Sequence, residues 1–397
     1  MKKRIKIYIQ HVSELFKCEP ASGILLFICA VIAIIIANSS YSTVYSEVLH
    51  TNISIGYKEY YISMSLAHWI NDGLMAIFFF VVGMEIKKEV LIGELRSLKT
   101  TILPIAAALG GMIVPAIVYL AFNYNQGSIH GFGIPMATDI AFALGVLSLV
   151  GQKAPKGIVI FLTALAVVDD LGAIIVIAVF YTNQISWFYL VLSVIILLVL
   201  ILANRCNVQS QTVFILLGIM LWFTVLKTGI HATFAGVLLG LIIPGSKDSK
   251  NYSKTMLYKL EHTISPWSSY VIMPIFALSN AGVILNKSSF SSIMSTPVSL
   301  GIILGLILGK QVGIYSVSIL LIKLKIAKLP SGVNKKHLYA ASVLGGIGFT
   351  MSIFISSLTF TEEAILSTAK ISIIVASLVS AIFGYILFRC MKSDKNT

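Results

Sequence analysis

The sequence is poor in charged residues and rich in apolar ones. Of its 397 residues, 11% are charged and 57% are hydrophobic, whereas a soluble domain carries about 25% charged residues. The mean hydropathy is +0.93. So few polar side chains could not cover so many apolar ones in water, which excludes an ordinary soluble fold. The composition predicts an integral membrane protein whose main solvent is the bilayer.

Cysteine is scarce, and the sequence motifs of common enzymes are absent. The four cysteines lie far apart, without a CxxC pair or a His/Cys cluster at metal-ligand spacing, so we expect neither a disulfide framework nor a transition-metal site. There is no P-loop and no GxSxG, and GGIGFT at 345–350 does not follow a strand. ATP-driven pumping, hydrolysis and dinucleotide binding therefore lack their residues, and we expect neither an enzyme nor a cofactor.

Basic residues exceed acidic ones, giving a formal net charge of +13. They lie at the ends of apolar segments, so we expect contact with membrane lipid and not with nucleic acid. The basic N-terminus, MKKRIK, precedes an apolar run that no AxA-like cleavage site follows. We interpret this run as an uncleaved first transmembrane span.

Twelve stretches are apolar enough to be transmembrane helices, which need about 20 residues each. They are residues 20–38, 67–86, 101–122, 132–150, 157–181, 187–203, 210–226, 231–243, 267–285, 297–322, 338–359 and 367–388. The fold class predicted is a single-domain, all-α polytopic membrane protein. The stretch 46–64 is too polar to cross, and its partial alternation around Gly56 fits a short external hairpin or an ordered loop equally well.

The basic residues in the loops also predict the orientation. Segments on one side of the twelve spans carry 24 Lys or Arg residues, and segments on the other side carry three. Loops rich in Lys and Arg stay in the cytoplasm, so both termini are expected there, with the chain in the bacterial inner membrane.

Four charged residues lie where the bilayer would surround them: Asp139, Asp169, Asp170 and Lys310. A charge at mid-bilayer costs about 2.5–3.5 kcal/mol even on the lenient insertion scale, so these residues suggest a function. Asp169 and Asp170 lie in the middle of the fifth span. Hard cations such as Na⁺ and Li⁺ prefer oxygen ligands, and two close carboxylates resist double ionisation. Such a pair suits competition between a cation and protons, although two buried acids neutralised by Lys310 and hydrogen bonds would be a purely structural alternative.

Two spans are interrupted by residues that break helices. In the fourth span, Gly131, Gly133 and Pro135 precede Thr138 and Asp139, and the eleventh span contains Gly345, Gly346, Gly348 and Thr350. Paired interrupted segments indicate a transporter binding site, whereas tight helix packing is the structural alternative. We expect Asp139 to face the positive N-terminal ends of half-helices and Lys310 to face their negative C-terminal ends. Lys310 is expected to pair with Asp169, or failing that with Asp139.

Long motifs resemble one family. ATDIAFALGVLSL at 137–149, LAVVDDLGAIIVIA at 165–178, LKTGIHATFAGVLLG at 226–240 and LGGIGFTMSIFI at 344–355 are similar to segments of the NhaA family of bacterial Na⁺/H⁺ antiporters, as are FFFVVGMEIKKEVLIGEL at 78–95 and LEHTISPWSSYVIMPIFALSNAG at 260–282. The resemblance runs through nearly the whole chain. It implies electrogenic exchange of cytoplasmic Na⁺ or Li⁺ for external protons by alternating access.

The resemblance also assigns roles to residues and spans. Asp169 and Asp170 match the family's ion-binding and proton-binding pair, with Asp139, Thr138 and Lys310 as its supporting residues. The family fold implies inverted repeats, with discontinuous helices in spans 4 and 11 that cross, core transport helices at 101–181 and 297–388, and a homodimer formed through the remaining helices and the hairpin at 46–64.

The family has a pH-sensing region, and matching residues are present here: Glu85, Lys88, Glu89, His231, Glu261 and His262. Ordinary interfacial charge is the structural alternative for this set. Lys88 stands where some members have arginine, which weakens two-pronged pairing with a carboxylate.

Two other kinds of transport remain as alternatives. A cation channel would ordinarily use a ring of charges or carbonyls from several subunits. A sodium-coupled symporter of an organic anion would need an arginine at membrane depth, and none of the spans contains one.

Overall fold

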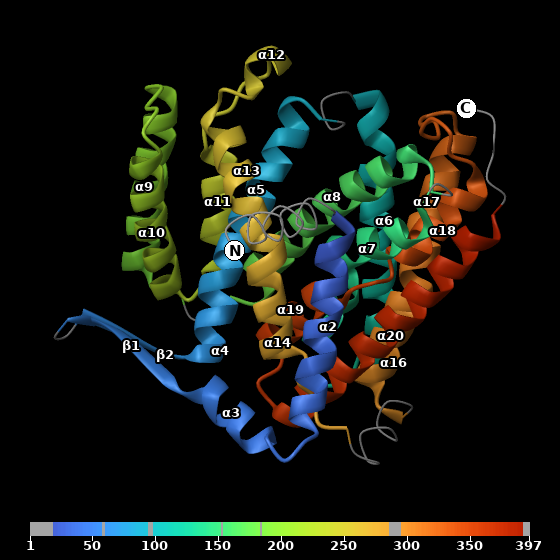
Figure 1. The fold of residues 1–397 in the computed structure, drawn as a ribbon, viewed down its shortest axis with the longest axis horizontal. Coiled ribbons are helices and arrows are strands. Elements are labelled where there is room, and N and C mark those ends of the chain that lie inside the picture. The colour runs from blue at the N-terminus through green and yellow to red at the C-terminus, as the bar shows by residue number, and fades with distance from the viewer. Residues whose placement is uncertain are drawn as a thin grey trace, which may run out of the picture.

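The computed structural model describes residues 19–57, 60–93, 98–151, 154–182, 185–285 and 295–391. Within these ranges the chain is almost entirely helical, with one two-stranded sheet that extends from the helical body (Figure 1). The prediction of a mostly helical membrane protein is confirmed. The basic termini that contribute to the orientation prediction, residues 1–18 and 392–397, lie outside the described residues.

Each of the twelve apolar stretches is helical over most of its length, and several consist of consecutive segments. In chain order these are α2 (Glu19–Ala37), η1 (Trp69–Leu74) with α5 (Met75–Leu91), α6 (Leu98–Asn123), η3 (Ile129–Met136) with α7 (Ile140–Val150), α8 (Lys156–Phe180), α9 (Trp187–Arg205), α10 (Gln211–Thr228), α11 (Thr233–Ile242), α13 (Met256–Trp267) with η5 (Ser268–Ile272) and α14 (Met273–Asn280), α16 (Pro297–Leu304) with η6 (Gly305–Gly309) and α17 (Lys310–Lys323), α18 (Lys335–Leu344) with α19 (Phe349–Thr359), and α20 (Glu363–Cys390). Three shorter helices are α3 (Ser42–His50), α4 (Leu66–His68) and α12 (Ser249–Tyr252).

Length and apolar character identify membrane-spanning helices among the described residues. Seven helices are long and apolar enough to cross a bilayer, and up to nine if each of two bent pairs forms one span. Their outer faces carry large apolar side chains, such as Phe188 on α9 with 73% of its surface exposed. Such surfaces are stable only against lipid or another apolar partner.

The ninth span differs from its prediction. The sequence predicted 267–285, whereas the helix runs from Met256 through a π-helical turn to Asn280. It begins earlier because the Thr255 hydroxyl accepts a hydrogen bond from the backbone N–H of Tyr258 and caps the helix. Hydropathy missed this first part because α13 is amphipathic, with polar side chains on one face.

The polar stretch at 46–64 contains the hairpin. Strand β1 (Asn52–Tyr57) pairs antiparallel with β2 (Tyr60–Ser65), with Asn52 opposite Ser65. Gly56 lies within β1, opposite Tyr61. The first part of the stretch belongs instead to helix α3. The hairpin projects from the lower left side of the body, whereas α12 lies at its top (Figure 1).

Buried side chains form two main apolar clusters. The large cluster contains residues of α2, α6, α7, α8, α14 and α16 to α20, and the small cluster contains residues of α9, α10, α11 and α13. Helix α5 contributes to both, with Phe79 in the large cluster and Met84 in the small one. Figure 1 shows α9 and α10 at one edge of the body and α17, α18 and α20 at the other.

Glycines allow pairs of helices to approach closely. A Cβ atom on Gly83 of α5 would lie 2.6 Å from the carbonyl oxygen of Val237, and one on Gly240 of α11 would lie 2.6 Å from that of Phe80. Gly110 of α6 faces Gly313 of α17 in the same way. Small residues at helix contacts are typical of membrane proteins, where backbone packing replaces the hydrophobic effect. The second pair holds α17, and with it Lys310, against α6.

Candidate ion-binding site

The two adjacent aspartates lie on the buried face of α8. Asp169 exposes 1% of its surface and Asp170 exposes 4%. Neighbouring side chains on a helix point about 100° apart, so the two carboxylates contact different surroundings. Each has one oxygen, Oδ1, that is buried without a hydrogen-bond partner in the protein.

Asp169 pairs with Lys310, as predicted. The Lys310 ammonium lies 2.7 Å from Asp169 Oδ2, and neither side chain is exposed. Its second partner is the Thr138 hydroxyl, whose oxygen lies 2.9 Å from Lys310 Nζ. Lys310 is the first residue of α17 and directly follows the π-helical turn η6. An uncompensated ammonium would be strongly disfavoured here, so the carboxylate and the hydroxyl explain how it is accommodated.

The two interrupted segments meet at Asp139. Residues 137–139 are not helical and separate η3 from α7, while residues 345–348 separate α18 from α19, which are bent by 41°. The backbone N–H of Asp139 donates to the carbonyl of Ile347 at 2.6 Å. The Thr138 hydroxyl donates to the carbonyl of Gly345 at 2.9 Å. Segments more than 200 residues apart in sequence are therefore joined next to the aspartate pair.

The Asp139 carboxylate accepts hydrogen bonds from two helix N-termini, which agrees with the sequence-based expectation. Its Oδ1 accepts from the backbone N–H of Phe142 in α7 at 2.9 Å. Its Oδ2 accepts from the backbone N–H of Thr350 in α19 at 3.1 Å and from the Thr350 hydroxyl. Negative charge is stabilised at such helix ends, so Asp139 holds the break in the chain together.

Lys310 is connected to the C-terminal end of α18 through the Thr138 hydroxyl, and no described hydrogen bond joins it to a carbonyl there directly. The carbonyl of Gly345, at the end of α18, accepts its hydrogen bond from Thr138, and Thr138 in turn accepts from Lys310. The lysine contacts the carboxylate because an ion pair compensates its buried charge better than a partial charge on a carbonyl does. Thr138 thereby links the lysine to the broken backbone.

The site offers oxygen ligands without a transition-metal cluster. Among the described residues, no three His, Cys, Asp or Glu side chains lie close enough to hold a metal ion together. The unpartnered Oδ1 atoms of Asp169 and Asp170 are acceptors that a proton or a small hard cation would satisfy. A buried acceptor without a partner is costly, so the aspartate pair favours binding of one or the other.

The predicted pH-sensing residues divide into two groups. Glu85, Lys88 and Glu89 share one face of α5, because residues three and four apart are neighbours on a helix. Lys88 Nζ lies 2.7 Å from Glu261 Oε1 of α13. Tyr252 of α12 donates to Glu261 Oε2 at 2.9 Å.

The neighbouring aromatic groups complete this first group. The ring of His262 stacks on that of Tyr258, with centroids 5.6 Å apart. Burial, with the adjacent negative charge of Glu261, raises the pKa of Tyr252 well above its ordinary value. Tyr252 therefore remains a hydrogen-bond donor to Glu261 throughout the neutral and moderately alkaline range.

His231 lies apart from this group, and it identifies a carboxylate that sequence reasoning missed. His231 Nε2 lies 3.0 Å from the carbonyl oxygen of Tyr181. Asp72 of η1 is close enough to His231 to interact with it electrostatically. Asp72 lies within the predicted span 67–86. A charged residue inside a predicted span is the signal that could have identified it from the sequence.

Comparison with known proteins gives one consistent result. The family described as Na⁺/H⁺ antiporter 1 matches residues 13–388. A protein of Clostridium beijerinckii named Na(+)/H(+) antiporter NhaA 1 is 61% identical over 393 residues, covering 99% of this chain and 98% of that protein. A Psychrobacter cryohalolentis protein named Na(+)/H(+) antiporter NhaA is 47% identical over 388 residues, covering 98% and 96%.

A solved structure has a related fold. The sodium proton antiporter MjNhaP1 from Methanocaldococcus jannaschii aligns with a TM-score of 0.59 at 13% identity, over 97% of this chain and 95% of that one. At this identity the likeness concerns the fold alone.

Proposed function

The chain belongs to the Na⁺/H⁺ antiporter 1 family, and on that premise we propose that it exchanges Na⁺ or Li⁺ for protons at Asp169 and Asp170. The observation that carries this proposal is a pair of adjacent buried carboxylates, each with an unpartnered oxygen, of which only Asp169 is paired with a lysine. The relatives are named as antiporters, which is consistent with a transporter and not an enzyme.

Competition for one site accounts for the exchange. Asp170 carries a carboxylate that Lys310 does not contact through any described hydrogen bond, so it is the more direct ligand for the cation. A proton and a monovalent cation each neutralise this carboxylate, and binding of one displaces the other. Protons that bind from the external side are therefore released when internal Na⁺ arrives.

Exchange is proposed to be electrogenic, with two protons per cation. One proton is carried by Asp170, and the second by Asp169 or Lys310. One net charge then moves inward in each cycle, and the membrane potential contributes about 2.3 kcal/mol per charge per 100 mV. This contribution drives sodium out of the cytoplasm.

Alternating access is proposed to move the core helices relative to the other spans. In a fold of twelve spans with inverted repeats, the discontinuous, crossing spans 4 and 11 belong to the core helices at 101–181 and 297–388, and these move relative to the dimerisation bundle formed by the remaining spans. The contacts between Asp139 and Thr350 support this arrangement, since they hold the two broken spans together. The chain is proposed to lie in the inner membrane with both termini in the cytoplasm, as a homodimer whose contacts include the hairpin.

Regulation by pH is proposed for the group at the end of α5. Glu85, Lys88 and Glu89 lie together there, and the ion pair from Lys88 to Glu261 connects α5 to α13. A change of charge in this group would alter the contact between the two helices. His231, near Asp72, is proposed as a second pH-responsive position.

The test uses everted vesicles energised by respiration, with a fluorescent reporter of internal acidity. NaCl, LiCl or KCl is added at about pH 7 and at about pH 8.5. We expect Na⁺ and Li⁺ to release protons with the parent protein and not with Asp170→Asn. The matched control is Asp248→Asn, an exposed carboxylate at the start of α12 that asparagine can replace as a helix cap.

Each outcome is informative. Loss of exchange in Asp170→Asn but not in Asp248→Asn supports the assignment. If neither Na⁺ nor Li⁺ releases protons at either pH, antiport is excluded and sodium-coupled transport of another solute becomes the better account. Cation current without proton movement would indicate a channel.

A further inference from the structure

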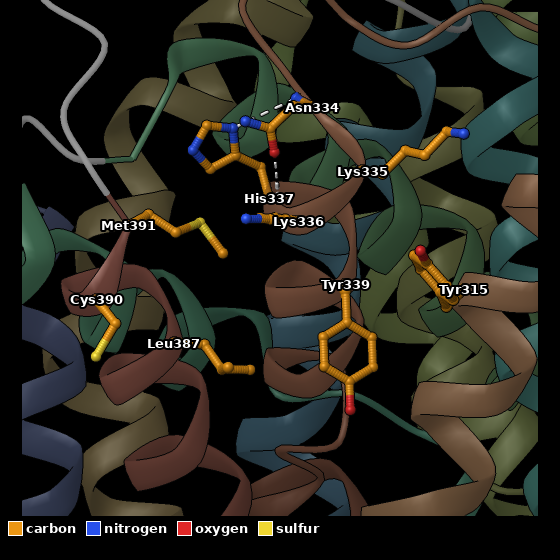
Figure 2. Close-up of a pocket in the computed structure, with 9 residues that line it drawn as sticks. All are labelled: Tyr315, Asn334, Lys335, Lys336, His337, Tyr339, Leu387, Cys390 and Met391. Carbon is orange, nitrogen blue, oxygen red and sulfur yellow. Dashed lines mark hydrogen bonds between the residues drawn. The ribbon is translucent and has the colours of Figure 1, made fainter.

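A pocket lies at one end of α17, α18 and α20, away from the aspartate pair. Figure 2 shows its lining, which includes Lys335 and Lys336 from the first turn of α18, Leu387 from the last turns of α20, and Met391 directly after that helix. Its volume is about 670 Å³. None of the residues assigned to ion exchange lines it.

The two charged side chains that line the pocket, Lys335 and Lys336, are both positive. Residues 310–361 and 364–391, which include α17, α18 and nearly all of α20, contain no Asp or Glu. Lys335 and Lys336 therefore have no carboxylate neighbour on the helices that form the pocket. Both side chains are exposed. Neither lysine forms an ion pair within the part of the chain that the structure describes, and cations at the rim of a pocket attract an anion.

The backbone adds a second attraction for an anion. Asn334 caps α18, accepting a hydrogen bond from the backbone N–H of His337 at 2.9 Å and donating its own N–H to His337 Nδ1 at 3.3 Å (Figure 2). The first-turn N–H groups of Lys335 and Lys336 have no acceptor within the helix. The positive end of the helix thus coincides with the two lysines, and phosphate groups bind at such ends.

The remaining lining combines apolar side chains of α20 with Tyr315 of α17 and Tyr339 of α18, and α17 and α20 also carry exposed apolar side chains. Leu387 and Met391 line the pocket. Next to them on α20, Phe383 exposes 42% of its surface and Ile386 exposes 47%, and Leu320 of α17 exposes 55%. A ligand held here would have an anionic group at the lysines and an apolar part along these helices.

We propose that this pocket binds the phosphate group of an anionic membrane phospholipid. The lysines and the α18 N-terminus hold the phosphate, and the acyl chains lie along α17 and α20. A free phosphate would use the cations but leave the adjoining apolar surface uncovered, which favours the lipid. Basic pockets between transmembrane helices on the cytoplasmic side are suited to such headgroups. This site is separate from the ion-exchange site and does not depend on its assignment.

The test is native mass spectrometry of the purified full-length protein with added phosphatidylglycerol or phosphatidylcholine. Lys335→Gln/Lys336→Gln removes both cations, and each basic residue near a membrane surface contributes about 1 kcal/mol, so affinity for phosphatidylglycerol should fall roughly 25-fold. The matched control is Lys247→Gln/Lys250→Gln, which removes two exposed lysines, one just before α12 and one within it. The control should retain the parent affinity, and phosphatidylcholine should bind weakly to all three.

Two further variants keep the test interpretable if the glutamine variant does not fold. Lys335→Arg/Lys336→Arg keeps both charges and should keep the lipid. Leu387→Trp narrows the apolar wall without removing charge, and it should weaken lipid binding even if the glutamine variant does not fold.

A separate arm identifies the source of the phosphate. Glycerol 3-phosphate and inorganic phosphate are titrated against the bound lipid. If either soluble phosphate binds as tightly as phosphatidylglycerol, the lipid assignment is wrong and a soluble phosphate compound occupies the pocket. If the glutamine variant binds phosphatidylglycerol within twofold of the control, the pocket does not bind phosphate.

Discussion

The ion pair between Lys310 and Asp169 is fully enclosed, so each partner depends on the other. Neither side chain is exposed, and Lys310 Nζ has only Asp169 and Thr138 as described hydrogen-bond partners. Burial removes the water that would otherwise stabilise each charge. Loss of one partner therefore costs more than the value of the pair itself.

Lys310→Met should lower the free energy of unfolding by about 3–5 kcal/mol, because it leaves the Asp169 carboxylate buried without its counter-charge. Chemical unfolding in detergent measures this. The control Lys227→Met removes an exposed lysine on α10 and should change stability by less than about 0.5 kcal/mol. Lys310→Met/Asp169→Asn should recover most of the loss. If the loss in the double variant equals the sum of the losses measured for Lys310→Met and for Asp169→Asn alone, the two residues are not coupled.

Unlike the enclosed pair of Lys310 and Asp169, the ion pair between Lys88 and Glu261 contributes less to stability, because Lys88 is partly exposed to solvent. Burial alone would lower the pKa of the Lys88 ammonium, but the hydrogen bond and charge of Glu261 outweigh it and raise that pKa above its ordinary value. The folded protein therefore holds this proton more tightly than the unfolded chain does. The resulting stability is present below about pH 10.4 and is lost as the pH rises through the folded-state pKa.

Lys88→Met should therefore reduce stability by a constant amount, at most about 1 kcal/mol, between about pH 7 and about pH 10. At higher pH the difference from the parent should disappear. Chemical unfolding across this pH range tests the prediction, with Lys250→Met as an exposed control. A difference that vanishes already near pH 8 would mean that Lys88 titrates in the neutral range.

The important charged residues could be found from the sequence, but most of their partners could not. Asp139, Asp169, Asp170 and Lys310 were identified because charge is rare at membrane depth. The bond from Thr350 to Asp139 joins residues 211 positions apart, and no sequence pattern predicts that contact. Asp72 was missed because it lies in the first turns of its span, where a charge is less conspicuous.

The contact between α5 and α11 depends on glycine at the scale of whole helices. Gly83 and Gly240 bring the two backbones together, and a Cβ atom on either would lie 2.6 Å from a carbonyl oxygen of the other helix. Backbone atoms cannot move aside as a flexible side chain can. The helices themselves would have to separate to admit a methyl group.

Gly240→Ala should therefore destabilise the protein by about 1–3 kcal/mol, the usual cost of overpacking. Gly73→Ala is the matched control, because its nearest neighbour would be a Trp69 ring carbon at an ordinary 3.6 Å. Thermal unfolding in detergent compares the two variants. Equal midpoints would show that the contact between α5 and α11 is looser than the structure indicates.

Elements with strong local signals were predicted, and those that depend on tertiary contacts were not. Glycine and proline in span 4, and glycine in span 11, predicted the breaks between η3 and α7 and between α18 and α19, because these residues interrupt helices locally. The extension of the ninth span back to Met256 was missed because its polar face packs against the end of α5. The π-helical turns η1, η5 and η6 have no distinct signal in the sequence.

At the scale of the molecule, the orientation in the membrane stays a prediction. It rests on the distribution of Lys and Arg, part of which lies outside the described residues. The division into transport core and dimerisation bundle also stays a prediction. Helices α2 and α14 lie outside the predicted core ranges 101–181 and 297–388, yet both contribute buried side chains to the large cluster.

Two exposed cysteines make the orientation testable. Cys206 follows α9 and Cys390 ends α20, and both are expected on the cytoplasmic side. In single-cysteine variants, a membrane-impermeant maleimide should label each of them in everted vesicles and not in intact cells. Ser54→Cys, in the exposed part of β1, should show the reverse. Labelling of all three from the same side would contradict the predicted topology.

The number of compensated charges at the site has a consequence for the valence of the transported ion. Asp169 is balanced by Lys310, and Asp139 by two helix N-termini, which leaves Asp170 as the single negative charge to be balanced. If the second proton leaves from Asp169 and Lys310 keeps its own, a bound monovalent ion makes the site neutral, whereas a divalent ion would leave a positive charge in a medium that solvates it poorly. Mg²⁺ and Ca²⁺ should therefore fail to displace protons from vesicles at concentrations where Na⁺ does so, even though both prefer oxygen ligands.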